Sequence, residues 1–204
     1  MGDEERPRRR QARGERRMAE ILAAAARVFA ESGYEAATTN AIAAAAGVSP
    51  GSLYQFFGNK EAVARALADR FVSEMRAAHA AAFDELDHAA LDLDELIDRM
   101  ADPIVAFNIA NPGFKALFAR PDMPPGLAAA ARPIQAALLG RVERMLEVRA
   151  PDLPSDDRAR TARVLIQLFQ AMVPLVTSTE GDERAASVRE MKKVLRGYLA
   201  PIVA

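Results

Sequence analysis

Apolar residues recur along this chain at three- and four-residue steps, which is the period of an amphipathic α-helix. The strict alternation of apolar and polar residues that marks a half-buried strand is missing, so the pattern predicts an all-α fold. The predicted helices cover residues 17–32, about 38–46, a short stretch between 49 and 58, 59 into the eighties, 93–109, 114–120, 125–148, 156–177 and 182–202.

The ends of the first helices carry specific boundary residues. Gly33 and Gly47 each follow a helical stretch, where glycine readily adopts the left-handed conformation that ends a helix. Ser49 precedes Pro50, a pairing typical of a helix N-cap and first helical position, and Asn59 can cap the next helix. Two short helices joined by a Gly-Val-Ser turn predict a helix-turn-helix.

A helix-turn-helix suggests what the second short helix does. Ile42, Val48 and Leu53 are placed to pack against the first helix, which leaves the opposite face open. In this motif the N-terminal residues of the second helix meet base edges in the major groove, and glutamine can pair with adenine. Lys60 stands at the start of the next helix, where free N–H groups favour an anion. The candidate DNA contacts on the second helix are therefore Pro50, Gly51, Ser52, Tyr54 and Gln55.

Positive charge is concentrated at one end of a chain whose net charge is −1. Between Arg6 and Arg17 there are seven arginines and a single glutamate, Glu15. One interpretation is a solvated, disordered tail. The other is an arginine arm that binds phosphates or a narrow minor groove. Either way, residues 1–16 are predicted to form a flexible Arg-rich arm.

Residues 17–63 resemble the DNA-binding domain of the TetR (tetracycline-repressor-like) family of bacterial regulators. The matching residues are Ile21-Leu22 through Phe29-Ala30, Gly33-Tyr34, Thr38-Thr39, Ile42-Ala43, Ala46-Gly47-Val48-Ser49, Leu53-Tyr54, Phe57 and Asn59-Lys60-Glu61. The resemblance covers about a quarter of the chain. It implies an all-helical homodimer, with a DNA-binding domain over 17–60 and a ligand-binding and dimerisation domain over 61–204.

The same resemblance implies particular DNA contacts. Family positions that match Thr39, Asn40, Ser52, Tyr54 and Lys60 commonly touch DNA. Phe56 departs from the family pattern, because His or Tyr often stands there and phenylalanine cannot donate a hydrogen bond to phosphate.

The second part of the chain carries no recognisable catalytic pattern. The sequence has no cysteine, and no Ser-His-Asp arrangement or Gly-rich phosphate loop stands out. Asp94, Asp98 and Asp102 share one helix face, which favours a solvated acidic face over a metal site. Asp84 and His88 have helical i,i+4 spacing, although His79 and His88 are nine residues apart. We expect no catalytic residue, metal or cofactor; a helical enzyme or metal-binding protein with an incidental helix-turn-helix is the alternative.

Large, adaptable apolar residues interspersed with amides suggest a pocket for a small lipophilic effector, neutral or anionic because no buried carboxylate is evident. The alternative is an ordinary core with solvent-facing amides. The candidate ligand-binding residues are Met100, Phe107, Phe114, Phe118, Gln135, Leu138, Gln167 and Gln170.

Two apolar stripes follow the last two predicted helices. A single core could bury both, or two copies could pair them in a four-helix bundle whose twofold symmetry suits a palindromic operator. The candidate dimer-interface residues are Leu168, Val188, Met191, Leu195, Tyr198 and Ile202.

These features together predict a ligand-responsive regulator that binds double-stranded DNA, and specifically a repressor released from its operator by the effector. No apolar run approaches the roughly 20 residues of a membrane span, and the Arg-rich start lacks the apolar stretch of a secretory signal. We therefore expect a cytoplasmic protein with no membrane partner.

Overall fold

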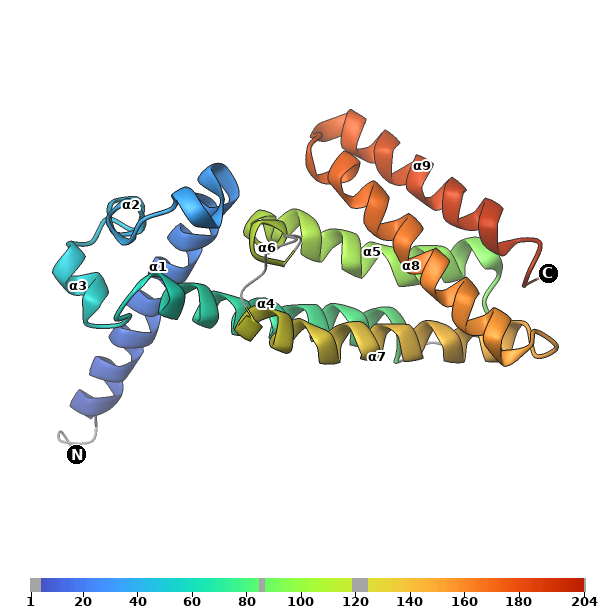
Figure 1. Cartoon of the computed structure of the whole chain (residues 1–204), viewed down its shortest axis with the longest axis horizontal. Helices are drawn as coiled ribbons and strands as arrows, with labels where there is room; N and C mark the ends of the chain where they lie inside the picture. Colours follow the sequence, from blue (N-terminus) through green and yellow to red (C-terminus); the bar gives the residue numbers. More distant parts are fainter. Residues whose placement is uncertain (1–4, 85–86, 119–124, 204) are drawn as a thin grey trace. The chain divides into compact units, whose positions relative to one another are not determined.

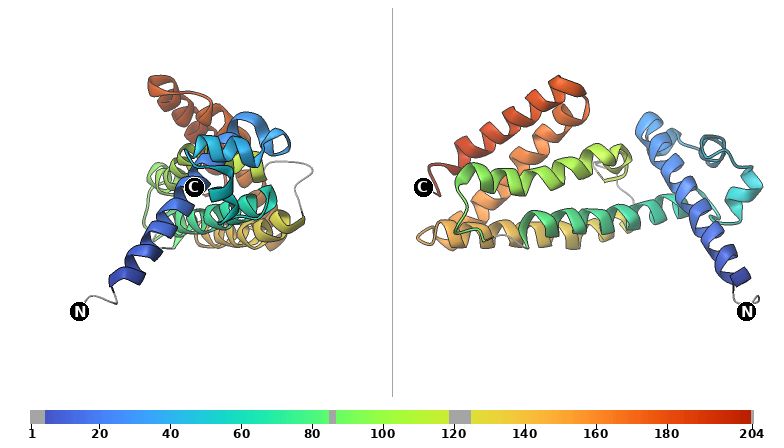
Figure 2. Two further views of the ribbon diagram at one scale, coloured as in Figure 1. Left: turned by 90° about the vertical axis from the view of Figure 1, so that its left-hand side faces the viewer. Right: turned by 180° about the vertical axis from the view of Figure 1, so that it is seen from behind.

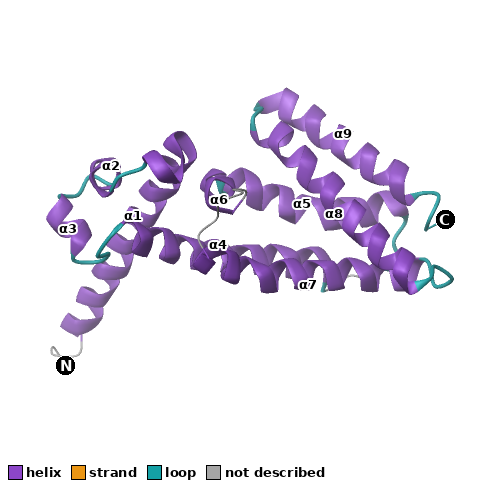
Figure 3. Cartoon of the chain, in the orientation of Figure 1, coloured by secondary structure: helices purple, strands orange, loops and turns teal. Residues whose placement is uncertain are grey.

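The computed structural model describes residues 5–84, 87–118 and 125–203, and every regular element within them is a helix (Figure 1, with two further views in Figure 2). Figure 3 shows helices joined by short loops, with no strand in the described ranges. The prediction of an all-α fold is confirmed. The helices are α1 (Glu5–Ala36), α2 (Thr39–Ala45), α3 (Pro50–Tyr54), α4 (Lys60–Phe83), α5 (Leu93–Ala110), α6 (Pro112–Phe118), α7 (Pro125–Arg149), α8 (Ser155–Thr177) and α9 (Gly181–Leu199).

The first helix differs from the prediction at its start. It begins at Glu5 instead of Arg17, so most of the segment expected to be a flexible arm has a helical backbone. Residues 5–20 include seven arginines and three glutamates, which have high helix propensity, and this outweighs the single Gly14. Pro7 lies in the first turn, where its missing N–H costs no intrahelical hydrogen bond. Near its other end, α1 is interrupted at Gly33, whose φ of 74° agrees with the glycine stop expected there.

Side-chain caps set the boundaries of the next helices. The Thr38 hydroxyl accepts a hydrogen bond from the Ala41 N–H at 3.1 Å and caps α2. The Ser49 hydroxyl accepts one from the Ser52 N–H at 3.1 Å and caps α3, with Pro50 in the first turn. The Asn59 carboxamide oxygen accepts from the Ala62 N–H at 2.8 Å at the start of α4. These bonds satisfy N–H groups that the first helical turn leaves without partners.

The chain divides into two compact units. The N-terminal unit comprises residues 1–71 and 111–130, and the C-terminal unit comprises residues 72–110 and 131–204. This division differs from the expected boundary between residues 60 and 61. The N-terminal unit includes the first half of α4 and, less expectedly, α6, which packs closely on α1.

In the N-terminal unit, α6 rests on α1 at Gly113. A β-carbon added at Gly113 would lie 2.5 Å from the carbonyl oxygen of Ala26 and 2.9 Å from its Cα, so only glycine permits this approach. The rings of Phe71 and Phe114 meet edge to face at 5.8 Å, and Phe114 stacks on Phe118 at 4.8 Å. The fully buried core residues of this unit include Ile21, Ala24, Ala25, Phe29, Ile42, Leu53, Val63 and Leu67.

The C-terminal unit combines an apolar core with ion pairs between its helices. Lys192 of α9 lies between Asp98 and Asp102 of α5, with its Nζ 2.8 Å and 2.6 Å from their carboxylate oxygens. Arg196 pairs with Asp94 at 2.6 Å. The three aspartates are exposed, as expected of a solvated acidic face, and each in addition pairs with a basic residue of α9, which the spacing along one helix did not predict. The core residues of this unit include Leu96, Ile97, Ala101, Met145, Leu146, Ala162, Leu165, Met191, Leu195 and Leu199.

Within the described ranges, no helix combines the length and the apolar character that crossing a bilayer requires.

Candidate nucleic-acid interface

Helices α2 and α3 form a compact helix-turn-helix in the N-terminal unit. Gly47, at φ 64°, makes the turn between them, and the Val48 N–H donates back to the Ala43 carbonyl at 3.0 Å. Ile42, Ala43 and Leu53 are fully buried and hold the pair in the core of the unit, where α2 packs against α1. The opposite faces of the two short helices are consequently left at the surface.

The predicted DNA contacts on α2 and α3 lie on this outward surface. Asn40, Pro50, Gly51 and Gln55 are exposed, while Thr39 and Ser52 are half-buried. Tyr54 is 51% exposed, which is high for a large aromatic side chain in this chain. The structure thus brings together seven of the eight predicted DNA-binding residues, and it leaves their polar groups accessible to a partner.

A hydrogen bond joins the start of α2 to the end of α3. The hydroxyl oxygens of Thr39 and Tyr54 are 3.1 Å apart, and either can be the donor. A hydroxyl has one donor and two acceptor sites, so this bond leaves capacity for a phosphate oxygen. The bond also restricts the exposed Tyr54 ring, which is held beside α2.

Ser52 has a structural partner of its own. Its hydroxyl lies 2.9 Å from that of Ser49, which caps α3. The side chain is therefore already oriented by the cap. Its remaining hydrogen-bonding capacity can still serve a DNA contact.

Lys60 occupies a position that sequence reasoning did not foresee. Its ammonium donates to the backbone carbonyls of Tyr34 at 2.8 Å and Glu35 at 3.0 Å, and it lies 4.6 Å from the centre of the Tyr34 ring. These contacts tie the first residue of α4 to the end of α1. An ammonium has three donors, so a phosphate contact by the third remains compatible with this geometry.

Arg27 is a contributor that the sequence analysis missed. Its guanidinium donates to the Ala45 carbonyl at 3.2 Å, at the C-terminal end of α2. A cation there satisfies a free carbonyl and complements the helix dipole. In the sequence Arg27 is simply a polar position on an amphipathic helix, and nothing indicates which neighbouring helix it meets.

The predicted effector-binding residues are divided between the two units. Phe114 and Phe118 belong to α6 of the N-terminal unit, whereas the other six lie in the C-terminal unit. Met100 and Phe107 are buried on α5, and Leu138 is half-buried on α7. Gln135, Gln167 and Gln170 are exposed, and the last two are hydrogen-bonded to each other at 3.3 Å.

A buried histidine is the polar group in the C-terminal unit that the sequence analysis underrated. His79 is only 3% exposed, and its Nδ1 has no hydrogen-bond partner within the described structure. Burial, helped by the positive charge of Arg141, lowers the pKa of His79 to about 4, although the Asp84 carboxylate acts in the opposite direction. Arg141 itself forms two 2.8 Å hydrogen bonds to Asp84. No group of three or more potential metal ligands occurs in the described part of the chain.

The predicted dimer-interface residues differ in accessibility. Met191 is fully buried and Leu195 nearly so, inside the core of one chain. Leu168, Val188, Tyr198 and Ile202 are half-buried. The most exposed large apolar residues of α8 and α9 are Leu175, at 49%, and Val194, at 40%, and neither is among the six predicted.

The chain is similar to known families of regulators over both of its parts. Residues 21–67 match the family model described as "Bacterial regulatory proteins, tetR family". Residues 92–199 match the one described as "Tetracyclin repressor-like, C-terminal domain". No curated protein matches the chain in sequence.

Several solved structures have a similar fold. A TetR-like transcriptional regulator from Rhodococcus sp. RHA1 is 23% identical with a TM-score of 0.71, over 89% of this chain and 94% of the other. A second bacterial regulatory protein of the tetR family, from Rhodococcus RHA1, is 26% identical with a TM-score of 0.66, over 88% and 95%. The TetR family regulator PfmR from Thermus thermophilus is 24% identical with a TM-score of 0.68, over 90% and 96%.

Proposed function

Because this chain belongs to the TetR family of bacterial transcriptional regulators, we propose that it is a repressor released from a palindromic operator by a small lipophilic effector. The family assignment confirms the resemblance stated from the sequence. Proteins of this family are in general transcription factors and not enzymes.

The helix-turn-helix surface supports DNA binding most directly. Asn40 and Gln55 carry exposed amides that can form hydrogen bonds with base edges. The hydroxyls of Thr39 and Tyr54 can form hydrogen bonds with the phosphate backbone of the DNA. The experiment is selection of duplexes from a random-sequence pool by the full chain, followed by gel-shift titration. We expect an inverted repeat with half-sites about one helical turn apart. Recovery of unrelated sequences only would contradict the operator proposal.

Repression is a separate part of the proposal. A promoter placed beside the selected site should yield fewer transcripts in a reconstituted transcription reaction as the protein is added. The same promoter with a scrambled site is the control. An increase in transcripts from the intact site would instead identify an activator.

The C-terminal unit supports an effector site. Met100 and Phe107 supply buried apolar surface, and the unpartnered Nδ1 of His79 supplies a polar atom that a bound molecule can satisfy. The helix α4 contributes to both units without a break. A displacement of its second half can therefore be transmitted along this helix to the unit that contains α2 and α3.

Thermodynamic linkage provides the test of the effector. An inducer must favour the form that does not bind DNA, because equal affinity for both forms shifts no population. A coupling of about 1–3 kcal/mol would make operator DNA weaken effector binding by about 5- to 150-fold. Calorimetry with decanoate and with decanol, each with and without the selected duplex, measures this factor for an anionic and a neutral probe. Equal affinities of a bound probe in both titrations would contradict the inducer role.

A further inference from the structure

The N-terminal part of α1 is a charged helical segment that the helix-turn-helix does not use. Residues 5–20 contain seven arginines and three glutamates, a net charge of +4, and they contain no lysine. From residue 12 on, where the structure describes burial, Arg13, Arg16 and Arg17 are exposed, as are all residues from 15 to 19, and the first buried residue is Ile21. The segment therefore contributes little to the described core, and we name residues 5–20 the arginine extension.

Resting on the proposed function, we propose that the arginine extension binds the phosphate backbone of the duplex outside the bases read by α3. Guanidinium groups match phosphate oxygens in a two-pronged geometry, and they remain charged at any physiological pH. Phosphate contacts of this kind add affinity without reading sequence.

The continuity of α1 places the extension at a defined position in the N-terminal unit. No non-helical backbone interrupts α1 before Gly33, and the same helix packs against α2 through its later turns. Figure 2 shows the first turns of α1 extending beyond α2 and α3 in both views. Sixteen residues at 1.5 Å each make the extension about 24 Å long, which is about seven base pairs at 3.4 Å each.

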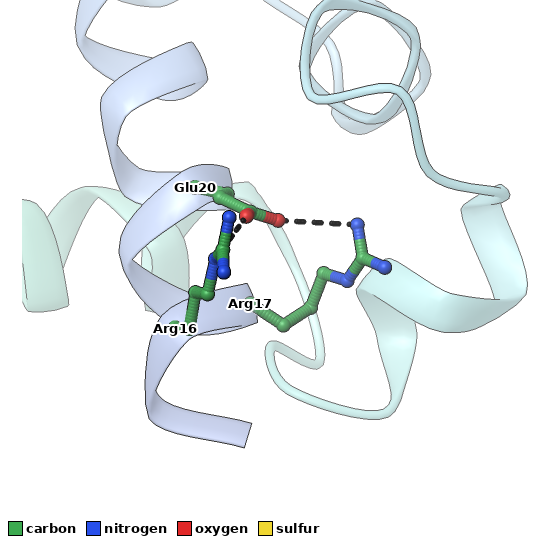
Figure 4. A network of polar contacts seen from close by, with 3 residues as sticks. All are labelled: Arg16, Arg17 and Glu20. Carbon is green, nitrogen blue, oxygen red and sulfur yellow. Dashed lines mark hydrogen bonds and ion pairs between the residues drawn. The ribbon is translucent and has the colours of Figure 1, made fainter. Parts of the chain in front are cut away.

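Two arginines of the extension whose side chains the structure describes form local ion pairs at its surface. Arg16 and Arg17 share one carboxylate, that of Glu20, each at 3.2 Å (Figure 4). The side chain of Arg16 is 84% exposed, so its pairing with Glu20 is screened by solvent and easily exchanged for a phosphate. In the sequence, Arg6, Arg10, Arg13 and Arg17 recur at steps of four, three and four residues, which puts their positions on one face of a helix.

The test compares the intact chain with the triple variant Arg13→Gln, Arg16→Gln, Arg17→Gln. The control is Arg132→Gln, Arg144→Gln, Arg163→Gln, which removes three exposed arginines from the C-terminal unit. Each protein is titrated by fluorescence anisotropy at four KCl concentrations against two duplexes. The trimmed duplex contains only the core of the selected operator, and the longer duplex contains the same core with 12 additional base pairs at each end. Circular dichroism verifies that all three proteins are folded.

We expect the intact chain and the control variant to bind the longer duplex at least tenfold more tightly than the trimmed one, and the extension variant to lose this advantage. The slope of log K against log salt on the longer duplex should become shallower by about 0.9 for each phosphate that the variant no longer neutralises. The same affinities and slopes for all three proteins would overturn this inference while leaving operator binding intact. An equal loss in the control variant would also overturn it.

Two further results separate the possibilities. If the intact chain binds neither duplex above its affinity for a scrambled sequence, the proposed function itself fails. The extension variant could keep the slope of log K for DNA binding against log salt and yet lose binding to phosphatidylglycerol vesicles. In that case the arginines bind a lipid surface, and the inference of DNA binding is overturned.

Discussion

The ammonium of Lys60 donates a hydrogen bond of 2.8 Å to the backbone carbonyl of Tyr34, and it also lies over the Tyr34 ring. This one side chain connects the start of α4 to the end of α1, beside the helix-turn-helix. A lysine expected to touch phosphate therefore also has a role in positioning the helices that support α3.

Replacing Lys60 by methionine should separate these two roles, because methionine keeps an apolar stem but removes the charge. We expect the free energy of unfolding to fall by about 1.5–3 kcal/mol, since two hydrogen bonds from a charged group are removed at a half-buried site, one of them exposed to solvent. DNA affinity should fall for all sequences, and the salt slope should become shallower by about one if the ammonium also meets a phosphate. Lys193→Met, at an exposed lysine of α9, is the control. An unchanged slope with reduced stability would leave Lys60 with the positioning role alone.

Tyr54→Phe should weaken operator binding while leaving the fold nearly intact. The substitution removes the hydroxyl that bonds Thr39 but keeps the ring, so we expect a stability loss of about 1 kcal/mol or less. A gel-shift double-mutant cycle with Thr39→Val measures whether the two hydroxyls act together. Strictly additive losses of affinity would show that they contact DNA independently, and no loss at all would remove Tyr54 from the interface.

Gly113→Ala should destabilise the N-terminal unit. The new β-carbon would meet backbone atoms of Ala26, which cannot move aside as a flexible side chain can, so α6 must shift on α1. Overpacking of this kind costs about 1–3 kcal/mol. Urea unfolding measures the loss, with Gly197→Ala of α9 as the control, because a β-carbon there meets no atom within 4 Å. That control should be neutral or stabilising by up to about 1 kcal/mol, and an equally neutral Gly113→Ala would contradict the close approach of α6.

His79 should make stability depend on pH between about 4 and 6.5. Its pKa is lowered from 6.5 to about 4 in the folded chain, so within this window the unfolded chain binds a proton that the folded chain does not. The free energy of unfolding should therefore increase with pH across this window and reach its full value above pH 6.5. His79 should account for about 3 kcal/mol of this increase at most.

Urea titrations from pH 4 to 7 test this dependence on the intact chain and on His79→Gln, which should give a flatter profile. Burial also lowers the pKa of His88, which acts in the same direction, so His88→Gln is the matched comparison. The lowered pKa of Asp84, bonded to Arg141, contributes stability that is lost as the pH falls below its ordinary value of 3.8. An unaltered profile in His79→Gln would show that His79 is not held neutral.

Leu175→Glu with Val194→Glu should yield monomers if α8 and α9 form the proposed dimer. Both residues are exposed and apolar, so charges there should leave the single chain folded while opposing association. Analytical ultracentrifugation measures the mass, and Val148→Glu, at an exposed position of α7, is the control. A double variant that remains a folded dimer would place the interface elsewhere. Leu195 is unsuitable for this test because it is buried within one chain.

The local features of this protein follow from its amino-acid sequence alone. Thr38, Ser49 and Asn59 cap helices because a side-chain oxygen needs only the N–H three residues ahead, and Gly47 makes a turn because its own φ requires it. Helical periodicity likewise predicted the helices and the helix-turn-helix, since it depends only on neighbouring positions.

Which helix faces meet is known only from the folded chain. Periodicity shows that a stripe is buried but does not say against what, so Met191 and Leu195 could be assigned to a dimer interface although they lie in the core of one chain. Lys192 finds Asp98 and Asp102 about 90 residues away in the sequence, and α6 joins the N-terminal unit through Gly113. The same holds for Lys60, whose partner carbonyls at Tyr34 and Glu35 belong to another helix. Such pairings depend on how helices that are distant in the sequence pack together, and the spacing of neighbouring residues does not specify this packing.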